Sequence, residues 1–207
     1  MTIEDPKDLV RRGYDALARR YDEAYDSDTK YGSWVAELNS LLRDGSSVLD
    51  LGCGSGVPVA RDIASAGHRV MGIDISRAQI SRAERFVPGA HFAQADATAL
   101  DFPPGSFDAV VALYVLIHVP LEQQLRLLER IASWLRPGGL LLCSTGLHEW
   151  TGVDDNWLDS GVAMWWSHTD ADTNRDWLVR SGLVIEREES VPEGDSGHML
   201  FWARRPA

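Results

Sequence analysis

The sequence predicts an α/β protein built around a mostly parallel β-sheet, and two patterns carry this prediction. Strand-like apolar segments alternate along the chain with segments of helical apolar spacing, which is the order of βαβ units. Val, Leu and Ile are nearly continuous in three of the strand-like segments, as expected for strands that helices cover on both faces.

The predicted elements follow from these periods in chain order. Helices are expected over residues 6–25, 30–43, 57–66, 77–87, 121–135 and 170–180. Strands are expected over 46–51, 68–74, 90–96, 107–113 and 139–145. The closing segments LVIEREESV and HMLFWARR, separated by the turn-forming PEGDSG, predict an antiparallel hairpin. Residues 146–168 fit neither period, so we expect them to be irregular.

Two helix boundaries have local support. Ser76 followed by Gln79 is a capping-box pattern at the start of the helix predicted over 77–87. Pro137-Gly138-Gly139 ends the helix predicted over 121–135, because proline lacks the backbone N–H that a helix needs.

The length and the net charge of the chain limit the number of domains and the kinds of partner. The 207 residues are 44% hydrophobic and 25% charged and contain no internal repeat or linker, so we expect one domain over residues 1–207. Lys and Arg number 20 against 31 Asp and Glu, a net charge of −11. Such a charge repels phosphate backbones and anionic lipids. We therefore expect neither a nucleic-acid nor a membrane partner.

The amino terminus and the cysteines favour a cytoplasmic protein. MTIEDPKDLV has neither the basic region nor the apolar run of a signal peptide, and the apolar stretch 109–121 is too short to cross a bilayer. Cys53 and Cys143 stand alone in strand-like segments, which predicts neither a disulfide framework nor a metal site. We expect a monomer or a homodimer.

The most informative motif is a glycine-rich turn after the first predicted strand. In VLDLGCGSG, Gly52, Gly54 and Gly56 stand at alternate positions, so the backbone can bend sharply and approach a ligand closely. No Gly-Lys-Ser/Thr follows, which excludes a P-loop. The third glycine comes one residue too early for the dinucleotide pattern, and Val57 occupies the position that this pattern requires.

Acidic residues end the next two predicted strands. Asp74 follows Gly52 by 22 residues, where a carboxylate accepts hydrogen bonds from both hydroxyls of a ribose. Asp96 ends the third strand, within reach of the exocyclic amine of an adenine on which Ile75 packs. Either aspartate alone fits a turn or helix-cap residue equally well. Together with the glycine turn, they predict an adenosine whose far end points toward that turn.

At this point the chain resembles a known family, the class I methyltransferases that use S-adenosylmethionine. The resemblance covers about residues 10–145. It rests on VLDLGCGSG, GIDIS, QADATAL, FDAVVALYVLIHV and LRPGGLLLCST, and on YDALARRYDEAY, which is similar to the helical lid of many small-molecule members. The resemblance implies a Rossmann-like sheet of order 3-2-1-4-5-7-6 with strand seven antiparallel, a helical lid over residues 1–43, S-adenosylmethionine as cofactor and no metal.

The resemblance also implies a role for each matching position. Gly52, Gly54 and Gly56 would line the methionine portion, Asp74 would hold the ribose, and Asp96 with the backbone of Ala97 would contact the adenine. Tyr14 or Tyr21 would face the cofactor carboxylate, although a packing stripe explains tyrosines at this spacing equally well. Ala112 or Leu113 would offer a carbonyl to the cofactor amine, and Asp50 would order the glycine turn.

Three histidines are candidates for a general base. Methyl transfer needs mainly alignment and exclusion of water, and a base contributes where the acceptor must lose a proton. His118 follows the fourth predicted strand, His148 follows the fifth, and His168 precedes the last helix. Packing is the alternative role for His118, and a solvated loop is the alternative for His148 and His168.

The segment after the fifth strand is the candidate cap over the acceptor substrate. Residues 146–168 contain Trp150, Trp157, Trp165 and Trp166, and no Lys or Arg occurs from 146 to 174. Tryptophan faces among acidic groups favour a cationic or aromatic ligand. We therefore expect Trp150, Trp165 and Trp166 to bind the acceptor.

These features together predict methyl transfer from S-adenosylmethionine, with release of S-adenosylhomocysteine, to an O or N atom of a small, aromatic or amine-bearing metabolite. Two alternatives stay open at this stage. One is a protein of the same scaffold that binds the cofactor without transfer or catalyses a rearrangement. The other, disfavoured by the early third glycine, is a nicotinamide-dependent oxidoreductase.

Overall fold

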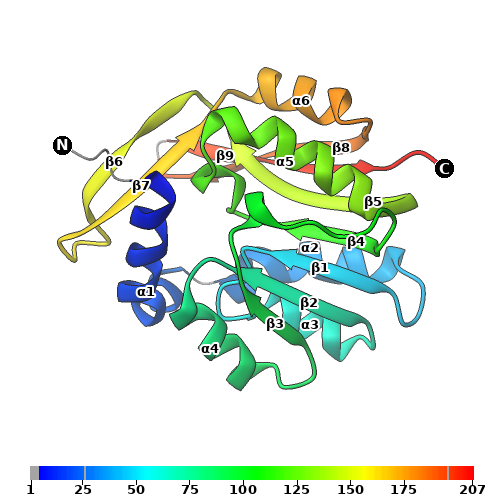
Figure 1. The fold of residues 1–207 in the computed structure, drawn as a ribbon, viewed down its shortest axis with the longest axis horizontal. Helices are drawn as coiled ribbons and strands as arrows, with labels where there is room; N and C mark the ends of the chain where they lie inside the picture. The colour runs from blue at the N-terminus through cyan, green and yellow to red at the C-terminus, as the bar shows by residue number, and fades with distance from the viewer. Residues whose placement is uncertain (1–4, 26, 195) are drawn as a thin grey trace.

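The computed structural model describes residues 5–25, 27–194 and 196–207, with the backbone alone over residues 27–30. Residues 1–4 and 26 of the predicted lid, and Asp195 of the predicted final turn, lie outside the described residues. Figure 1 shows one twisted sheet with helices on both faces, and a further hairpin lying beside the first helix at one end of the sheet.

The main sheet has seven strands in the order β3-β2-β1-β4-β5-β9-β8. This confirms the predicted order, since β8 and β9 are the sixth and seventh strands of this sheet along the chain. Pairing is parallel from β3 to β5 and antiparallel between β5, β9 and β8. The strands are β1 (Ser47–Leu51), β2 (Arg69–Asp74), β3 (His91–Gln94), β4 (Phe107–Ala112), β5 (Leu135–Gly146), β8 (Val184–Glu193) and β9 (Ser196–Arg204).

The six predicted helices are present with small shifts at their ends. They are α1 (Pro6–Ala24), α2 (Ser27–Leu41), α3 (Val59–Ser65), α4 (Arg77–Phe86), α5 (Leu121–Trp134) and α6 (Ala171–Arg180). Two short 3-10 helices follow strands of the sheet, η1 (Ala97–Ala99) and η2 (Leu116–His118).

The prediction of an irregular segment over residues 146–168 is wrong. Strand β5 continues to Gly146, and the rest forms an antiparallel hairpin of β6 (Trp150–Trp157) and β7 (Val162–His168). Most of β6 is exposed on both of its faces, so the alternation of apolar and polar residues that marks a half-buried strand is missing there. The short acidic sequence of β6 therefore does not resemble a strand.

Each face of the main sheet packs against its own helices. In β1, Leu49 and Leu51 belong to the core under α5 and α6, whereas Val48 belongs to the core under α2 and α3. This alternation is the period of two expected for a strand covered on both faces. The intervening Asp50 is only 3% exposed, so the sheet carries a buried carboxyl group next to the glycine turn.

Helix α1 begins at a well-formed cap and lies across the carboxyl ends of the strands. The Asp5 side chain accepts a hydrogen bond from Lys7 N at 3.0 Å, and Pro6 occupies the first turn, as is favourable at a helix start. At Gly13 a Cβ atom would lie 2.6 Å from the Met164 side chain, so the lack of a side chain lets α1 approach β7 closely.

Polar contacts fix α1 to the body of the protein. The Asp15 carboxylate accepts hydrogen bonds from Ser76 Oγ at 2.7 Å and from Ala78 N at 3.0 Å. It therefore caps α4 from a different helix, where an anion is favoured by the helix dipole. An ion pair between Asp22 and Arg82 joins the same two helices.

The capping box predicted at the start of α4 forms only in part. Ser76 Oγ accepts a hydrogen bond from Gln79 N at 3.2 Å, as predicted. The Gln79 amide does not bond back to Ser76 N, which donates to Asp74 Oδ1 at 2.8 Å instead.

Among the described residues, every helix is too short or too polar to form a membrane span.

Replacing Asp15 with Ala should loosen α1 without unfolding the sheet. The change removes a cap from α4, so we expect a loss of about 1 kcal/mol in the free energy of unfolding and faster hydrogen exchange in α1. Glu23→Ala is the matched control, because Glu23 is 67% exposed and its ion pair among the described residues is with Arg19 on the surface of α1. Equal exchange rates in the two variants would contradict the docking role of Asp15.

Candidate functional site

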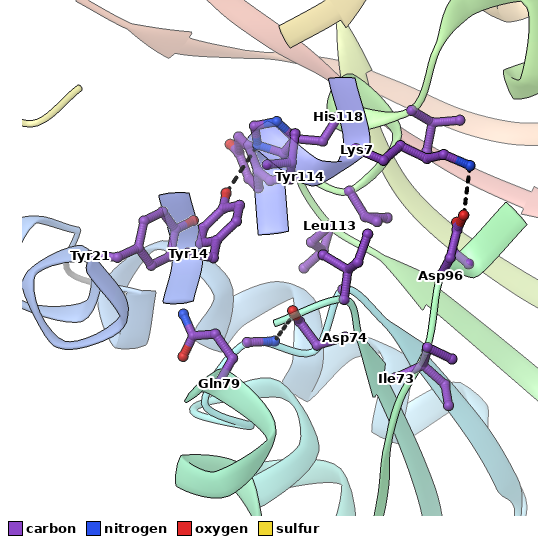
Figure 2. A pocket seen from close by; sticks show the side chains of 18 residues that line it. Lys7, Tyr14, Tyr21, Ile73, Asp74, Gln79, Asp96, Leu113, Tyr114 and His118 are labelled. Carbon is purple, nitrogen blue, oxygen red and sulfur yellow. Dashed lines mark hydrogen bonds and ion pairs between the residues drawn. The ribbon is translucent and has the colours of Figure 1, made fainter. Parts of the chain in front are cut away.

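A cavity lies at the carboxyl ends of β1, β2 and β4, under α1 (Figure 2). Its empty volume is about 710 Å³, including the part open to solvent. Nine of the predicted cofactor residues line it: Tyr14, Tyr21, Gly52, Gly54, Asp74, Ile75, Asp96, Ala97 and Leu113. The topology thus brings together residues from five separate motifs.

The glycine turn adopts the conformation that its sequence predicts. Gly52 and Gly54 have φ angles of 68° and 54°, in the left-handed region that favours glycine. Gly54 N donates to Asp74 Oδ2 at 2.9 Å, so the turn is bonded to the end of β2. Gly56 lies outside the cavity lining, and a Cβ there would lie 3.2 Å from the Val87 side chain.

Asp74 and Asp50 are buried carboxyl groups with perturbed acidity. Burial raises the pKa of Asp74 to about 6, although backbone N–H donors of Ser76 and Gly54 partly oppose the shift. Burial, and then the charge of Asp74, raises the pKa of Asp50 to about 8. Asp50 Oδ2 is buried without a hydrogen-bond partner among the described residues, and Asp50 lines a second cavity that shares Tyr21, Gly52, Gly54 and Leu113 with the first.

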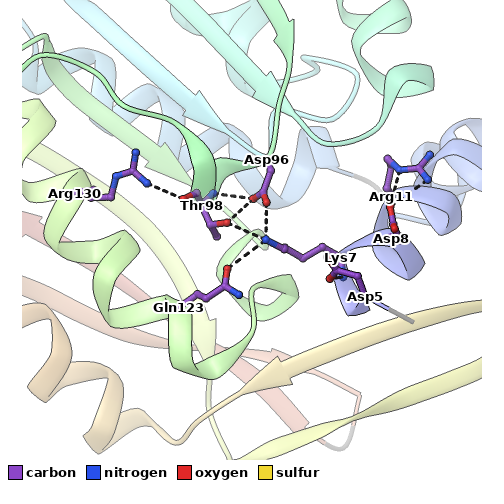
Figure 3. A network of polar contacts seen from close by, with 8 residues as sticks. All are labelled: Asp5, Lys7, Asp8, Arg11, Asp96, Thr98, Gln123 and Arg130. Carbon is purple, nitrogen blue, oxygen red and sulfur yellow. Dashed lines mark hydrogen bonds and ion pairs between the residues drawn. The ribbon is translucent and has the colours of Figure 1, made fainter. Parts of the chain in front are cut away.

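Asp96 is part of a polar network at the other end of the cavity (Figure 3). Its Oδ1 accepts hydrogen bonds from Thr98 N and Thr98 Oγ1, both at 2.8 Å, and its Oδ2 pairs with Lys7 Nζ at 2.6 Å. Lys7 Nζ also donates to Thr98 Oγ1 at 3.1 Å and Gln123 Oε1 at 3.3 Å. Burial opposes ionisation of Asp96, but these donors outweigh it and lower its pKa.

His118 joins the lid helix to the β6–β7 hairpin. Its Nδ1 lies 2.8 Å from the carbonyl oxygen of Trp165, and its Nε2 lies 3.0 Å from Tyr14 Oη. Because a carbonyl only accepts, Nδ1 carries the proton and Nε2 accepts the Tyr14 hydroxyl proton. Burial lowers the pKa of His118 to about 4, which keeps this neutral tautomer. The Tyr14 hydroxyl proton is therefore engaged with His118.

The other two candidate histidines lie outside the cavity lining. His148 is exposed, and its carbonyl oxygen lies 2.5 Å from His168 Nδ1 at the end of β7. Burial lowers the pKa of His168. Of the three histidines predicted as bases, the structure thus brings His118 to the cavity and leaves His148 and His168 in contact with each other outside its lining.

The predicted acceptor tryptophans form an aromatic cluster with α1 instead of lining the cavity. Trp165 is 8% exposed and packs in a core with Val10 and Leu17 of α1. The Trp166 ring lies 5.6 Å from that of His118 and 6.0 Å from that of Trp150. Trp150 is 45% exposed, so of these three side chains it offers the largest free face.

Three residues with polar side chains line the cavity without having been predicted as site residues from the sequence. Lys7 comes from the first turn of α1, Gln79 from α4 and Tyr114 from the end of β4. Tyr114 has a φ of 58°, unusual for a residue with a side chain, and its Oη donates to Glu193 Oε1 at 2.6 Å. Gln79 was recognised only as a capping residue, and no sequence signal marked Lys7 or Tyr114, because each reaches the cavity through tertiary packing.

Comparisons with known proteins agree with this geometry. A family model described as a methyltransferase domain matches residues 48–139. The chain is 34% identical over 163 residues to the 27-O-demethylrifamycin SV methyltransferase of Amycolatopsis mediterranei, covering 68% of this chain and 59% of that protein. A crystal structure of an S-adenosylmethionine-dependent methyltransferase from Mesorhizobium loti matches with a TM-score of 0.66 and 26% identity, covering 82% of this chain and 96% of that chain.

The chain belongs to the class I S-adenosylmethionine-dependent methyltransferases. It is also 29% identical over 202 residues to the ubiquinone biosynthesis O-methyltransferase of Bradyrhizobium diazoefficiens, covering 88% of this chain and 72% of that protein. The chain spans less than two thirds of the length of the rifamycin relative. The family residues matched by the domain model include the glycine turn, Asp74 and Asp96, which the structure places around one cavity.

Replacing Asp50 with Asn should change how stability depends on pH. With a folded pKa near 8, above the unfolded value of about 3.9, Asp50 keeps a proton that the unfolded chain releases. Stability is then lost as pH rises toward 8, at up to about 1.4 kcal/mol per pH unit. Urea unfolding at pH 6.5 and pH 8 should show a loss in the wild type that Asp50→Asn lacks. Asp44→Asn is the control, because Asp44 is exposed, and its stability should fall with pH as in the wild type. An equally steep fall in the stability of Asp50→Asn would contradict this assignment.

Proposed function

We propose that the protein transfers a methyl group from S-adenosylmethionine to an oxygen or nitrogen atom of a small, aromatic or amine-bearing acceptor. The observation that carries this proposal is the cavity in which the Gly54–Asp74 hydrogen bond joins the glycine turn to the acidic end of β2. Family membership supports the same cofactor and reaction class, and it disfavours the nicotinamide-dependent oxidoreductase.

The charges around the cavity fit this cofactor. Asp22, Asp74 and Asp96 line the two cavities that share residues, whereas Lys7 is the one Lys or Arg among their described lining residues. S-adenosylmethionine bears a sulfonium and an ammonium group, and clefts of one charge sign concentrate ligands of the opposite sign. The unpartnered Oδ2 of Asp50 is an acceptor available to such a ligand.

Each part of the cofactor has candidate partners in the cavity. Asp74 would hold the ribose, Asp96 and the backbone of Ala97 the adenine, and Ile75 the face of the ring. Leu113 would offer its carbonyl to the amine. The cofactor supplies an electrophilic methyl group with its own leaving group, so the protein's task is to align the acceptor and exclude water. Helix α1 covers the cavity and would exclude water from it.

The pair of Tyr14 and His118 is our candidate for proton transfer. Tyr14 Oη can accept the acceptor's proton while its own proton moves to His118 Nε2, and His118 Nδ1–H stays on the Trp165 carbonyl. A pKa near 4 makes His118 a weak base, so its contribution should lie near the lower end of general-base effects, about 10²-fold. His148 and His168, which lie outside the cavity lining, remain candidates only for contacts with the acceptor outside the cavity.

The acceptor is proposed to enter beside the β6–β7 hairpin. Trp150 offers an exposed ring, and Trp165 and Trp166 hold the hairpin on His118 and α1. The names of two relatives, the 27-O-demethylrifamycin SV methyltransferase and the ubiquinone biosynthesis O-methyltransferase, specify an oxygen atom, which supports oxygen before nitrogen. Aromatic side chains at this edge favour a planar acceptor.

Calorimetric titration with S-adenosylhomocysteine tests the cofactor assignment. We expect wild-type binding in the micromolar range or tighter, and Asp74→Ala should weaken it at least tenfold because an acceptor of the ribose hydroxyls is lost. Asp101→Ala is the control, since the side chain of Asp101 is 93% exposed near the adenine end. Absence of wild-type binding at high micromolar ligand would falsify the proposed function.

Turnover tests the proton-transfer pair. A panel of phenolic and amine acceptors is scored by formation of S-adenosylhomocysteine, and the best acceptor is used for kinetics. Tyr14→Phe should lower kcat by about 10²-fold with less than a threefold change in affinity for S-adenosylhomocysteine. Tyr25→Phe is the same change outside the described cavity lining and should leave kcat near the wild-type value. Equal kcat values for all three proteins would exclude Tyr14 from the reaction.

A further inference from the structure

Gln79 is a buried amide that has no hydrogen-bond partner where it faces the cavity. The residue is 1% exposed, and neither its Nε2 nor its Oε1 bonds to any described residue. It lines the same cavity as Asp74, and Figure 2 shows both side chains at one end of the cavity, near Tyr14. A buried amide without partners lowers the stability of the folded protein, so its presence calls for a reason.

A second buried glutamine shows what a structural role looks like in this fold. Gln124 is 3% exposed, and its Nε2 donates to the carbonyl oxygens of Leu116, Val119 and Ser167 at 2.7–3.1 Å. It joins η2 to β7. Gln79 makes no comparable contact, although its backbone N–H is well capped by Ser76. The side-chain amide of Gln79 therefore joins no elements of the described fold by a hydrogen bond, and its donors and acceptor are available to a ligand.

The hydrogen bonds of Asp74 indicate which group of a ligand Gln79 would bind. Each oxygen of Asp74 already accepts one backbone N–H, from Gly54 or from Ser76, and a carboxylate only accepts. A hydroxyl group both donates and accepts. Each hydroxyl that donates to Asp74 can therefore still accept a hydrogen bond at its own oxygen. The amide of Gln79, next to Asp74, can donate one.

We propose that Gln79 binds the ribose diol of the cofactor together with Asp74, donating from Nε2 to a hydroxyl oxygen. This inference rests on the proposed function, because it requires an adenosine in the cavity. It makes Gln79 a binding residue for the cofactor, and it explains why a buried amide is left unpaired in the protein alone.

Titration of matched ligands tests the contact. Gln79→Met keeps the length of the side chain and removes both polar groups. Relative to the wild type it should weaken S-adenosylhomocysteine about three- to tenfold, the value of one neutral hydrogen bond. Analogues that lack the 2′- or the 3′-hydroxyl should bind the wild type more weakly than S-adenosylhomocysteine does. The analogue that lacks the hydroxyl bound by Gln79 should bind Gln79→Met and the wild type with nearly equal affinity. Equal losses of affinity on Gln79→Met for all three ligands would overturn the proposal.

Thermal unfolding of the ligand-free protein separates a binding role from a structural one. Gln79→Met should raise Tm by at least about 2 °C, since an unpaired buried amide is removed. Gln124→Met, the same substitution at a fully bonded site, should lower Tm. A fall in Tm for Gln79→Met would mean that the amide supports the fold, and would overturn the proposal.

The two proposals fail in different ways. If the wild type does not bind S-adenosylhomocysteine, the proposed function fails. If the wild type binds and Gln79→Met binds equally well, only the role of Gln79 fails. A change confined to the KM for the acceptor would assign Gln79 to the acceptor and would also overturn the ribose contact.

Discussion

The hydrogen bond from Gly54 N to Asp74 Oδ2 is the constraint on which the rest of the site depends. It requires a left-handed turn after β1, so that the backbone of the glycine turn reaches the end of β2. It also fixes one oxygen of Asp74, while Ser76 N fixes the other. Ser76 begins α4, and Asp15 of α1 bonds to the same helix start. One carboxylate thus sets the positions of the glycine turn, of α4 and, through α4, of the lid.

The lid is held at its other side by a second set of bonds that also reaches the cavity. Tyr14 of α1 bonds to His118 after β4, and His118 bonds to the Trp165 carbonyl in β7. Lys7 pairs with Asp96 at the end of the cavity formed by β3. Opening α1 would break contacts to three different parts of the structure at once. The lid, the hairpin and the cavity walls therefore form one connected unit, and a ligand under α1 would be shielded from water by the same contacts that orient His118.

The sequence predicts well the sheet and the strand-end residues that line the cavity, because those features are local. A strand, a turn and an acidic strand end are adjacent in the chain, and parallel topology brings successive strand ends to one edge. The β6–β7 hairpin was missed since β6 is exposed on both faces and has no apolar period. Trp165 and Trp166 were expected at the acceptor, but their rings fill the space between hairpin and α1, and sequence alone does not show which surface a tryptophan covers. Lys7 and Gln79 reach the cavity from helices whose orientation is set by long-range contacts.

Within the described residues, two buried polar groups beside the cavities lack the hydrogen bonds that comparable groups elsewhere in the fold make. Gln124 and Asn174 are buried amides that bond to three carbonyl oxygens each. Asp50 Oδ2 and the Gln79 amide are buried as deeply and have no partner among the described residues. Both lie beside the two cavities that share residues. A ligand that satisfies such groups binds the folded state and not the unfolded chain, so it raises stability in proportion to its occupancy. The same groups that weaken the empty protein would then make cofactor binding and folding reinforce each other.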